Sequence, residues 1–347
     1  MKKTLISSSV TAFLALLSAQ NVLAAVAEPE PPAPPPAQCN ITFATGAAGK
    51  GYSKYYANYA KVCPQVPTCE KTSEGGLENL SLLIAKEADV GLADVFTLMN
   101  MLDKDDAYKG LQVVASLHNN LLHVLTLTNG FDLPGQPVAG PKVKNPKYSI
   151  APWNKEPEFI DGPPVPGPTV HVDIGAFSHL KGKPVGLVGS AQFIVRKLDS
   201  MAGHGMVFTD YDSDAAAIAA LKSGKVQGVM TMAAWPHGVI DKMKPAEGIK
   251  LVNYDLQATA PLFTTKKGYK NLGQYSVQFL GTPNVLLTRP FTPGGENARL
   301  VASIRSCIAT NLQKLKDTKG FEPAWSEVND MRQTFTLPAF LGQPAKK

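Results

Sequence analysis

The sequence predicts an α/β protein built from two similar lobes with a ligand cleft between them. Residues 72–94 have the layout of a loop, a helix and a strand, because a glycine pair at residues 75–76 precedes leucines at helical spacing and then an apolar run that ends at Asp94. Residues 211–232 repeat this layout. The part that follows the proline-rich N-terminal region is roughly 300 residues long, which favours two domains.

Both units point to one rim of each predicted sheet as the ligand site. Ligands of open α/β sheets lie outside the carboxyl ends of the strands, which places the glycine turn and Asp94 on the same rim. In the second unit, one of the residues 212–214 can cap the helix and Gly224 ends it. Such a cleft is typical of a two-lobed solute-binding protein, although two adjacent domains of an enzyme would show the same repeat.

The N-terminal region predicts export. Residues 1–24 combine Lys2 and Lys3 with a short apolar run and a small-residue end, as a secretory signal peptide does. Residues 25–38 are rich in proline and predict an extended spacer. Cys39 does not stand in a small apolar lipobox, so we expect a periplasmic protein without a lipid anchor.

The charge pattern excludes nucleic acid as the expected partner. The formal net charge is +6, two of the basic residues lie in the signal peptide, and no run of five or six like charges occurs. The closely spaced Lys142, Lys144 and Lys147 fit a solvated loop.

Four cysteines in an exported chain predict two disulfides. Three pairings are possible. We expect Cys63 to pair with Cys69, because they are close in sequence and flank prolines that favour a turn, which leaves Cys39 to pair with Cys307. A zinc site is the weaker interpretation, since no CxxC pair or HxxxH pattern occurs, and no metal or other cofactor is expected.

A first strand at residues 39–45 leads through a glycine-rich turn at 46–51 into a helix. The turn matches neither a P-loop nor a dinucleotide fingerprint, because its glycines are misspaced for both. A glycine turn that enters a helix still presents unpaired backbone N–H groups to an anion. The alternative is a tight turn without a ligand.

Other catalytic or metal motifs are weak. Asp210, Asp212 and Asp214 alternate as in a calcium loop, but the glycine and the terminal glutamate of that loop are missing, so helix capping explains them better. His118 and His123 would face opposite sides of one strand and are interpreted as structural. No nucleophile elbow surrounds Ser190, and the protein is not expected to be an enzyme.

Three stretches of the first lobe resemble the TAXI family of TRAP-transporter solute receptors. They are residues 45–52 (TGAAGKGY), 72–80 (TSEGGLENL) and 86–94 (KEADVGLAD). Residues 180–190 and 232–236 fit the second lobe of that family. The resemblance implies a type II periplasmic-binding-protein fold, a small carboxylate or amino-acid-like ligand, and the membrane subunits of a transporter as partner. An ABC-transporter receptor, a sensor input module and an enzyme on the same fold are the alternatives.

The predicted boundaries follow from this organisation. Lobe 1 comprises residues 39–125, with 285–347 returning to it, and lobe 2 comprises 126–284. An insertion at 131–178, rich in proline and glycine, is interpreted as a long loop near the crossing between lobes. Its Trp153 either anchors this loop or covers the cleft, and anchoring is favoured.

The predicted site joins two helix N-termini, one after Gly46 and one after Ser190, which together attract an anionic group. Tyr52 and Trp235 supply apolar walls, and polar side chains bind the other polar groups of a small anionic or zwitterionic solute. Two of the predicted site residues, Glu74 and Asp94, are carboxylates, and they favour an ammonium group on the ligand or a bound cation. The family usually has a serine at the position of Gly76 and more hydroxyls around residues 189–192. The predicted ligand-binding residues are Thr45, Gly46, Tyr52, Glu74, Gly76, Asn79, Asp94, Ser190, Gln192 and Trp235.

Overall fold

The structure, a computed structural model, describes residues 39–328 and 331. The predicted signal peptide and proline-rich spacer lie outside the described residues. Within the described part, no helix is long and apolar enough to cross a membrane.

Two groups of elements repeat the same design. The first module begins with β1 (Ile41–Ala44), α1 (Gly51–Val62), β2 (Thr68–Lys71), α2 (Gly76–Ile84), β3 (Val90–Asp94), α3 (Val95–Leu102) and the 3₁₀ turn η1 (Asp106–Gly110). The second module contains η2 (Phe177–Leu180), β7 (Pro184–Val188), α4 (Ala191–Ala202), β8 (Val207–Tyr211), α5 (Asp214–Lys222), β9 (Gly228–Ala234), η3 (Ile240–Lys242), η4 (Pro245–Glu247), β10 (Ile249–Leu251), β11 (Phe263–Tyr269) and η5 (Lys270–Leu272). The chain then returns to the first module through α6 (Glu296–Thr310), α7 (Leu312–Asp317) and η6 (Pro323–Glu327).

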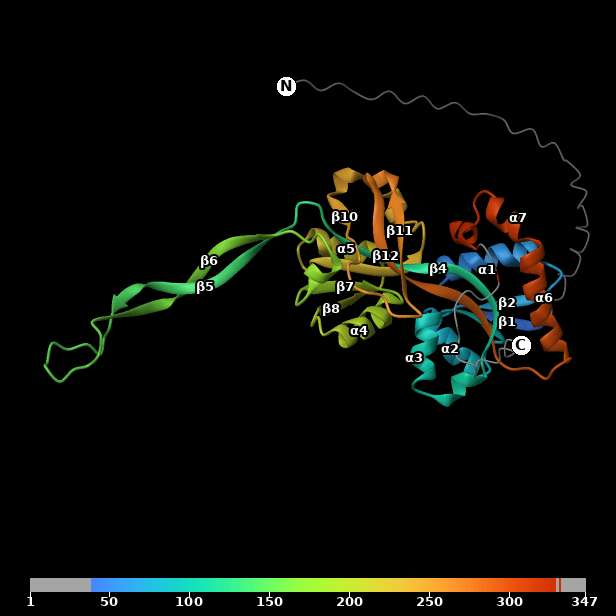
Figure 1. Ribbon diagram of the computed structural model, residues 1–347, viewed down its shortest axis with the longest axis horizontal. Helices are drawn as coiled ribbons and strands as arrows, with labels where there is room; N and C mark the ends of the chain where they lie inside the picture. The colour runs from blue at the N-terminus through green and yellow to red at the C-terminus, as the bar shows by residue number, and fades with distance from the viewer. Residues whose placement is uncertain (1–38, 329–330, 332–347) are drawn as a thin grey trace, which may run out of the picture. The chain divides into compact units, whose positions relative to one another are not determined.

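Two long strands, β4 (Gln112–Leu127) and β12 (Gln274–Thr288), connect the modules (Figure 1). The described strands of this sheet follow the order β2-β1-β3-β12-β4-β9-β7-β8, with β10 paired to β4 and β11 to β12. The triplets β2-β1-β3 and β8-β7-β9 are parallel and have the same internal order, whereas β12 and β4 are antiparallel to their neighbours. The predicted α/β class with two related modules is confirmed.

The modules have largely separate cores, with Phe96 of α3 joining the core of the second module. In the first, one apolar cluster lies under α1, α6 and η6 and a second lies under α2 and α3. In the second, a single cluster joins β7 and β9 to α4 and α5. The predicted boundaries at residues 125 and 284 fall inside β4 and β12, which are continuous strands.

The disulfide pairing predicted from sequence is wrong. Cys39 pairs with Cys69, with their Cα atoms 5.5 Å apart, and Cys63 pairs with Cys307 at 6.0 Å. The parallel pairing of β1 with β2 aligns Thr42 with Cys69 and so brings Cys39 close to that strand. Cys63 follows α1 and meets Cys307 of α6 within the same apolar cluster.

The segment predicted to be a long loop is instead a β-hairpin. β5 (Phe131–Lys144) and β6 (Phe159–Val172) pair antiparallel and form a two-stranded sheet of their own. Proline is tolerated in such strands because their outer edges need no donor, and glycine allows close backbone approach. Trp153 lies in the connecting turn with 83% of its surface exposed, so the interpretation that it anchors the segment is wrong.

Candidate ligand-binding site

The end of β1 and the start of α1 place Tyr52 against the two connecting strands. Thr45 is fully buried and its hydroxyl donates to Glu70 Oε1 at 2.7 Å, so its side chain is engaged within the protein. A Cβ at Gly46 would lie 3.4 Å from the Tyr52 Cβ. The Tyr52 hydroxyl donates to Asn284 Oδ1 at 3.2 Å and accepts a hydrogen bond from Asn120 Nδ2 at 3.2 Å. Tyr52 therefore links the first module to β4 and β12.

Asn79 joins the end of β1 to the middle of β3. Its buried amide nitrogen donates to the carbonyl oxygens of Thr45 and, at 2.7 Å, of Leu92, while its Oδ1 accepts from the Ser73 hydroxyl at 2.6 Å. These bonds occupy the side chain with protein partners. Gly76 lies beside it, and a Cβ there would come within 3.3 Å of Ala93 Cα, which explains why this helix begins with glycine.

The two predicted carboxylates play different parts. Asp94 is buried and caps α3, because its Oδ1 accepts from Thr97 N and its Oδ2 from Thr97 Oγ1, both at 2.8 Å. Burial raises the pKa of the Asp94 carboxyl, and the bonds from Thr97 oppose that shift. Glu74 is exposed, and its backbone N–H donates to Glu78 Oε2. Asp94 is thus engaged as a helix cap, whereas Glu74 lies at the surface.

In the second module, Ser190 and Gln192 begin α4. Ser190 is half-buried and its hydroxyl caps no backbone N–H of the helix. The Gln192 carbonyl accepts from Arg196 Nη1 at 2.8 Å, which leaves its side-chain amide outside that contact. Neither α4 nor α1 has an acidic residue in its first turn, so nothing in those turns neutralises the positive end of either helix dipole.

Trp235 follows β9 and combines an aromatic face with a donor that has no partner. Its indole Nε1 is buried and unbonded, which is costly unless a ligand or water completes it. The Lys267 ammonium lies 4.5 Å from the centre of the Trp235 ring. Lys267 also pairs with Glu327 at 2.6 Å. The side chain of Trp235, just after β9, therefore has the Lys267 ammonium over its ring and an indole N–H without a partner.

His237 connects this region to the turn before α1. Its backbone N–H donates to the Tyr269 hydroxyl at 2.7 Å, its Nε2 lies 3.6 Å from Asp214 Oδ2, and its Nδ1 has no partner. Burial lowers the pKa of His237, Asp214 opposes the shift and the charge of Lys50 adds to it. Lys50 precedes α1, so the glycine turn of the first module approaches the His237 loop of the second.

β4 contains a row of buried polar side chains that was not predicted from the sequence as a group. Ser116, His118 and Asn120 alternate in this strand, and all three are buried. Asn284 Nδ2 donates to His118 Nε2 at 3.1 Å, which assigns the proton to Nδ1. Burial lowers the pKa of His118 to about 4, so the ring is neutral near pH 7. The spacing of these three polar residues, two apart in an otherwise apolar strand, was the sequence pattern that could have predicted this row.

His123 faces a different set of partners, as the alternation of the strand predicts. Its Nε2 lies 2.8 Å from the Tyr269 hydroxyl, whereas His118 contacts Asn284. Burial lowers the pKa of His123 to about 3. In the described part of the chain, no group of three or more His, Cys, Asp or Glu side chains is placed to hold a metal ion.

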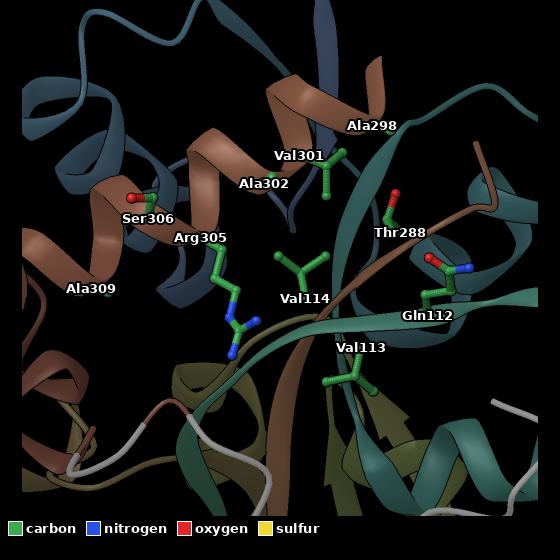
Figure 2. Close-up of a pocket in the computed structure, with 10 residues that line it drawn as sticks. All are labelled: Gln112, Val113, Val114, Thr288, Ala298, Val301, Ala302, Arg305, Ser306 and Ala309. Atoms are coloured by element: carbon green, nitrogen blue, oxygen red, sulfur yellow. The ribbon is translucent and has the colours of Figure 1, made fainter. Parts of the chain in front are cut away.

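A separate hollow of about 550 Å³ lies between α6 and the start of β4 (Figure 2). Val301 of α6 and Val114 of β4 lie across it from one another, and Arg305 extends from α6 at its side. Most of its lining is apolar or small. None of the predicted ligand-binding residues lines this hollow.

No protein-family model matches the chain, and no curated protein matches its sequence. Among solved structures, an ancestral arginine-binding protein bound to arginine is 13% identical, with 84% of this chain and 98% of the other covered and a TM-score of 0.44. The substrate-binding protein of an amino acid ABC transporter is 9% identical, with 79% and 93% covered and a TM-score of 0.42. A histidine kinase sensor domain with similarity to periplasmic binding proteins is 12% identical, with 84% and 97% covered and a TM-score of 0.45.

Proposed function

We propose that this protein is an extracytoplasmic receptor that binds a small anionic solute and delivers it to a membrane transporter. The observation that carries the proposal is the position of the Lys267 ammonium over the ring of Trp235, whose indole N–H is buried and unpaired. A carboxylate can accept from that N–H beside the Lys267 ammonium, whose charge Glu327 already shares. The half-buried ring provides an apolar wall beside it.

The start of α1 in the first module also favours an anionic ligand. The start of α1 carries Lys50 and no acidic residue, and its N-terminal N–H groups favour an anion. Asp94 is engaged in capping and Glu74 is exposed, so the case for a ligand ammonium group or a bridging cation loses its basis. We therefore favour a carboxylate over an amino acid, with a zwitterion as the second choice.

Transport is proposed to follow from closure of the two modules on the ligand. A ligand that contacts both modules selects the closed form, and the membrane partner recognises that form. The motif resemblance at residues 45–52 and 86–94 favours a TRAP-type partner. Genes for TRAP membrane subunits beside this one would support that choice, and genes for an ABC permease and ATPase would replace it.

The binding test is calorimetry on the purified exported protein with succinate, 2-oxoglutarate, L-glutamate, L-glutamine and L-arginine. We expect a dicarboxylate to bind and Lys267→Met to weaken it at least tenfold, since a hydrogen bond to a charged group contributes about 1.5–3 kcal/mol. The neighbouring Lys266→Met is the matched control, because Lys266 is exposed on the same strand. Thermal melting of both variants shows whether loss of the Glu327 pair has unfolded the protein.

Ser190→Ala tests the second helix N-terminus. We expect about a tenfold loss of affinity for the same dicarboxylate, because one hydrogen bond to a charged group disappears. Binding that is unchanged in Ser190→Ala and Lys267→Met alike would remove this site from consideration. Hydrolysis or other turnover of a panel member would instead favour the enzyme alternative.

A further inference from the structure

The turn that joins β5 to β6 presents two large apolar side chains to solvent. Ile150 is 91% exposed and Trp153 is 83% exposed, the highest values for large apolar residues among those the structure describes. The half-buried Tyr148 lies in the same turn. Exposed apolar groups gathered at one turn indicate an interaction surface rather than scattered surface residues.

The turn holds this conformation through its own hydrogen bonds. Asn145 Oδ1 accepts from Lys147 N and its Nδ2 donates to the Pro157 carbonyl, both at 2.9 Å. Asn154 Nδ2 donates to the Ser149 carbonyl, and its backbone N–H donates to the Ala151 carbonyl, also at 2.9 Å. The apolar side chains are thus displayed by an ordered turn, which lowers the entropy that binding would cost.

The hairpin is attached to the second module at its other end. Phe131, the first residue of β5, is buried in the core of that module, and its neighbour Asp132 accepts from His171 Nδ1 at 2.8 Å. Beyond this base, β5 and β6 pair only with each other among the described strands. Prolines along both strands, among them Pro137 and Pro166, cannot donate to an added strand. A partner therefore meets the side chains of the turn.

The charges at the turn are balanced. Residues 145–158 contain Lys147 and Lys155 against Glu156 and Glu158. Because these charges balance, the turn does not favour nucleic acid or a strongly charged protein as its binding partner. Tryptophan, tyrosine and an aliphatic residue with lysines beside them match the composition that settles at the boundary between lipid headgroups and acyl chains. A stable protein interface needs about 800 Å² from each partner, more than a few side chains supply.

We propose that residues 145–158 insert Ile150 and Trp153 into the interfacial layer of a lipid bilayer. The hairpin then tethers the second module weakly and reversibly to a membrane surface. Because the turn has no net charge, the association depends on apolar burial and changes little with salt. This inference is independent of the ligand site and of the transporter type.

The test is flotation of the purified exported protein with phosphatidylcholine vesicles at low and high salt. We expect wild type to float at both, and Ile150→Ser/Trp153→Ser to lose about tenfold or more in partitioning. Val207→Ser/Tyr275→Ser is the matched control, because both side chains are exposed but lie outside the hairpin. It should partition like wild type. Tryptophan emission should shift to the blue with vesicles, since Trp153 is the exposed tryptophan and Trp325 is fully buried.

Three results would overturn the proposal. Wild type that stays with the soluble fraction shows that the turn does not enter lipid. Flotation that high salt abolishes shows electrostatic adsorption of the basic chain. Concentration-dependent self-association that the double substitution removes, without flotation, assigns the turn to a second copy of the protein. Equal melting temperatures for the variants establish that each comparison is made on folded protein.

Discussion

At the scale of single residues, Asn79 is the side chain whose loss should weaken the first module most directly. It joins the end of β1, through Thr45, to β3, through Leu92. We expect Asn79→Ala to lower the free energy of unfolding by about 2–4 kcal/mol, because buried carbonyls and the Ser73 hydroxyl lose their partner. Urea unfolding measures this. Ser81→Ala, on the exposed side of the same helix, should change stability by less than about 0.5 kcal/mol.

His118 gives the protein a predictable response to acid. Its pKa falls from 6.5 to about 4 on folding, so below pH 6.5 the unfolded chain binds a proton that the folded chain does not. The free energy of unfolding is therefore highest above pH 6.5 and decreases as the pH falls toward 4. At pH 5 the decrease due to His118 is about 2 kcal/mol.

Urea unfolding at pH 8 and pH 5 isolates this contribution. His118→Gln should show a smaller drop between the two pH values than wild type, by about 2 kcal/mol, even though it is less stable at pH 8. The exposed His179→Gln should keep the wild-type drop. An equal decrease in the free energy of unfolding from pH 8 to pH 5 in all three proteins would show that folding does not lower the pKa of His118.

At the scale of elements, the β5–β6 hairpin depends on glycines that face carbonyl groups. A Cβ on Gly140 would collide with the carbonyl oxygen of Pro163, and one on Gly167 with that of Gln136. Gly140→Ala should therefore open the hairpin while the two module cores stay folded. Hydrogen exchange should rise in residues 131–172 alone. Gly238→Ala, where a Cβ meets no atom within 4 Å, should leave the exchange pattern of wild type.

The two disulfides differ in how much chain they close. Mass mapping of unreduced protein should recover Cys39 with Cys69 and Cys63 with Cys307. The first spans 30 residues and the second 244, so replacing Cys63 and Cys307 by serine should cost about 2 kcal/mol more than replacing Cys39 and Cys69. Recovery of a peptide that joins Cys63 to Cys69 would restore the pairing expected from sequence.

At the scale of the whole molecule, the sequence predicted what local patterns encode. The units at residues 72–94 and 211–232 are each a short helix followed by a strand, and both were found. The hairpin was missed because proline and glycine normally mark loops, and only pairing between β5 and β6 allows them here. The contacts of Tyr52 were missed for a different reason. Its partner Asn284 is 232 residues away in sequence, beyond any local signal.

The return of the chain through β12 also sets the order in which this protein can be completed. β3 pairs with Asn284–Thr288 of β12, and Cys63 bonds to Cys307, so both wait for the last third of the chain. During synthesis the first module has an open sheet edge and an uncovered apolar face until α6 arrives. The module that emerges first is therefore the one that is finished last, and it is the part that a chaperone would have to shield for longest.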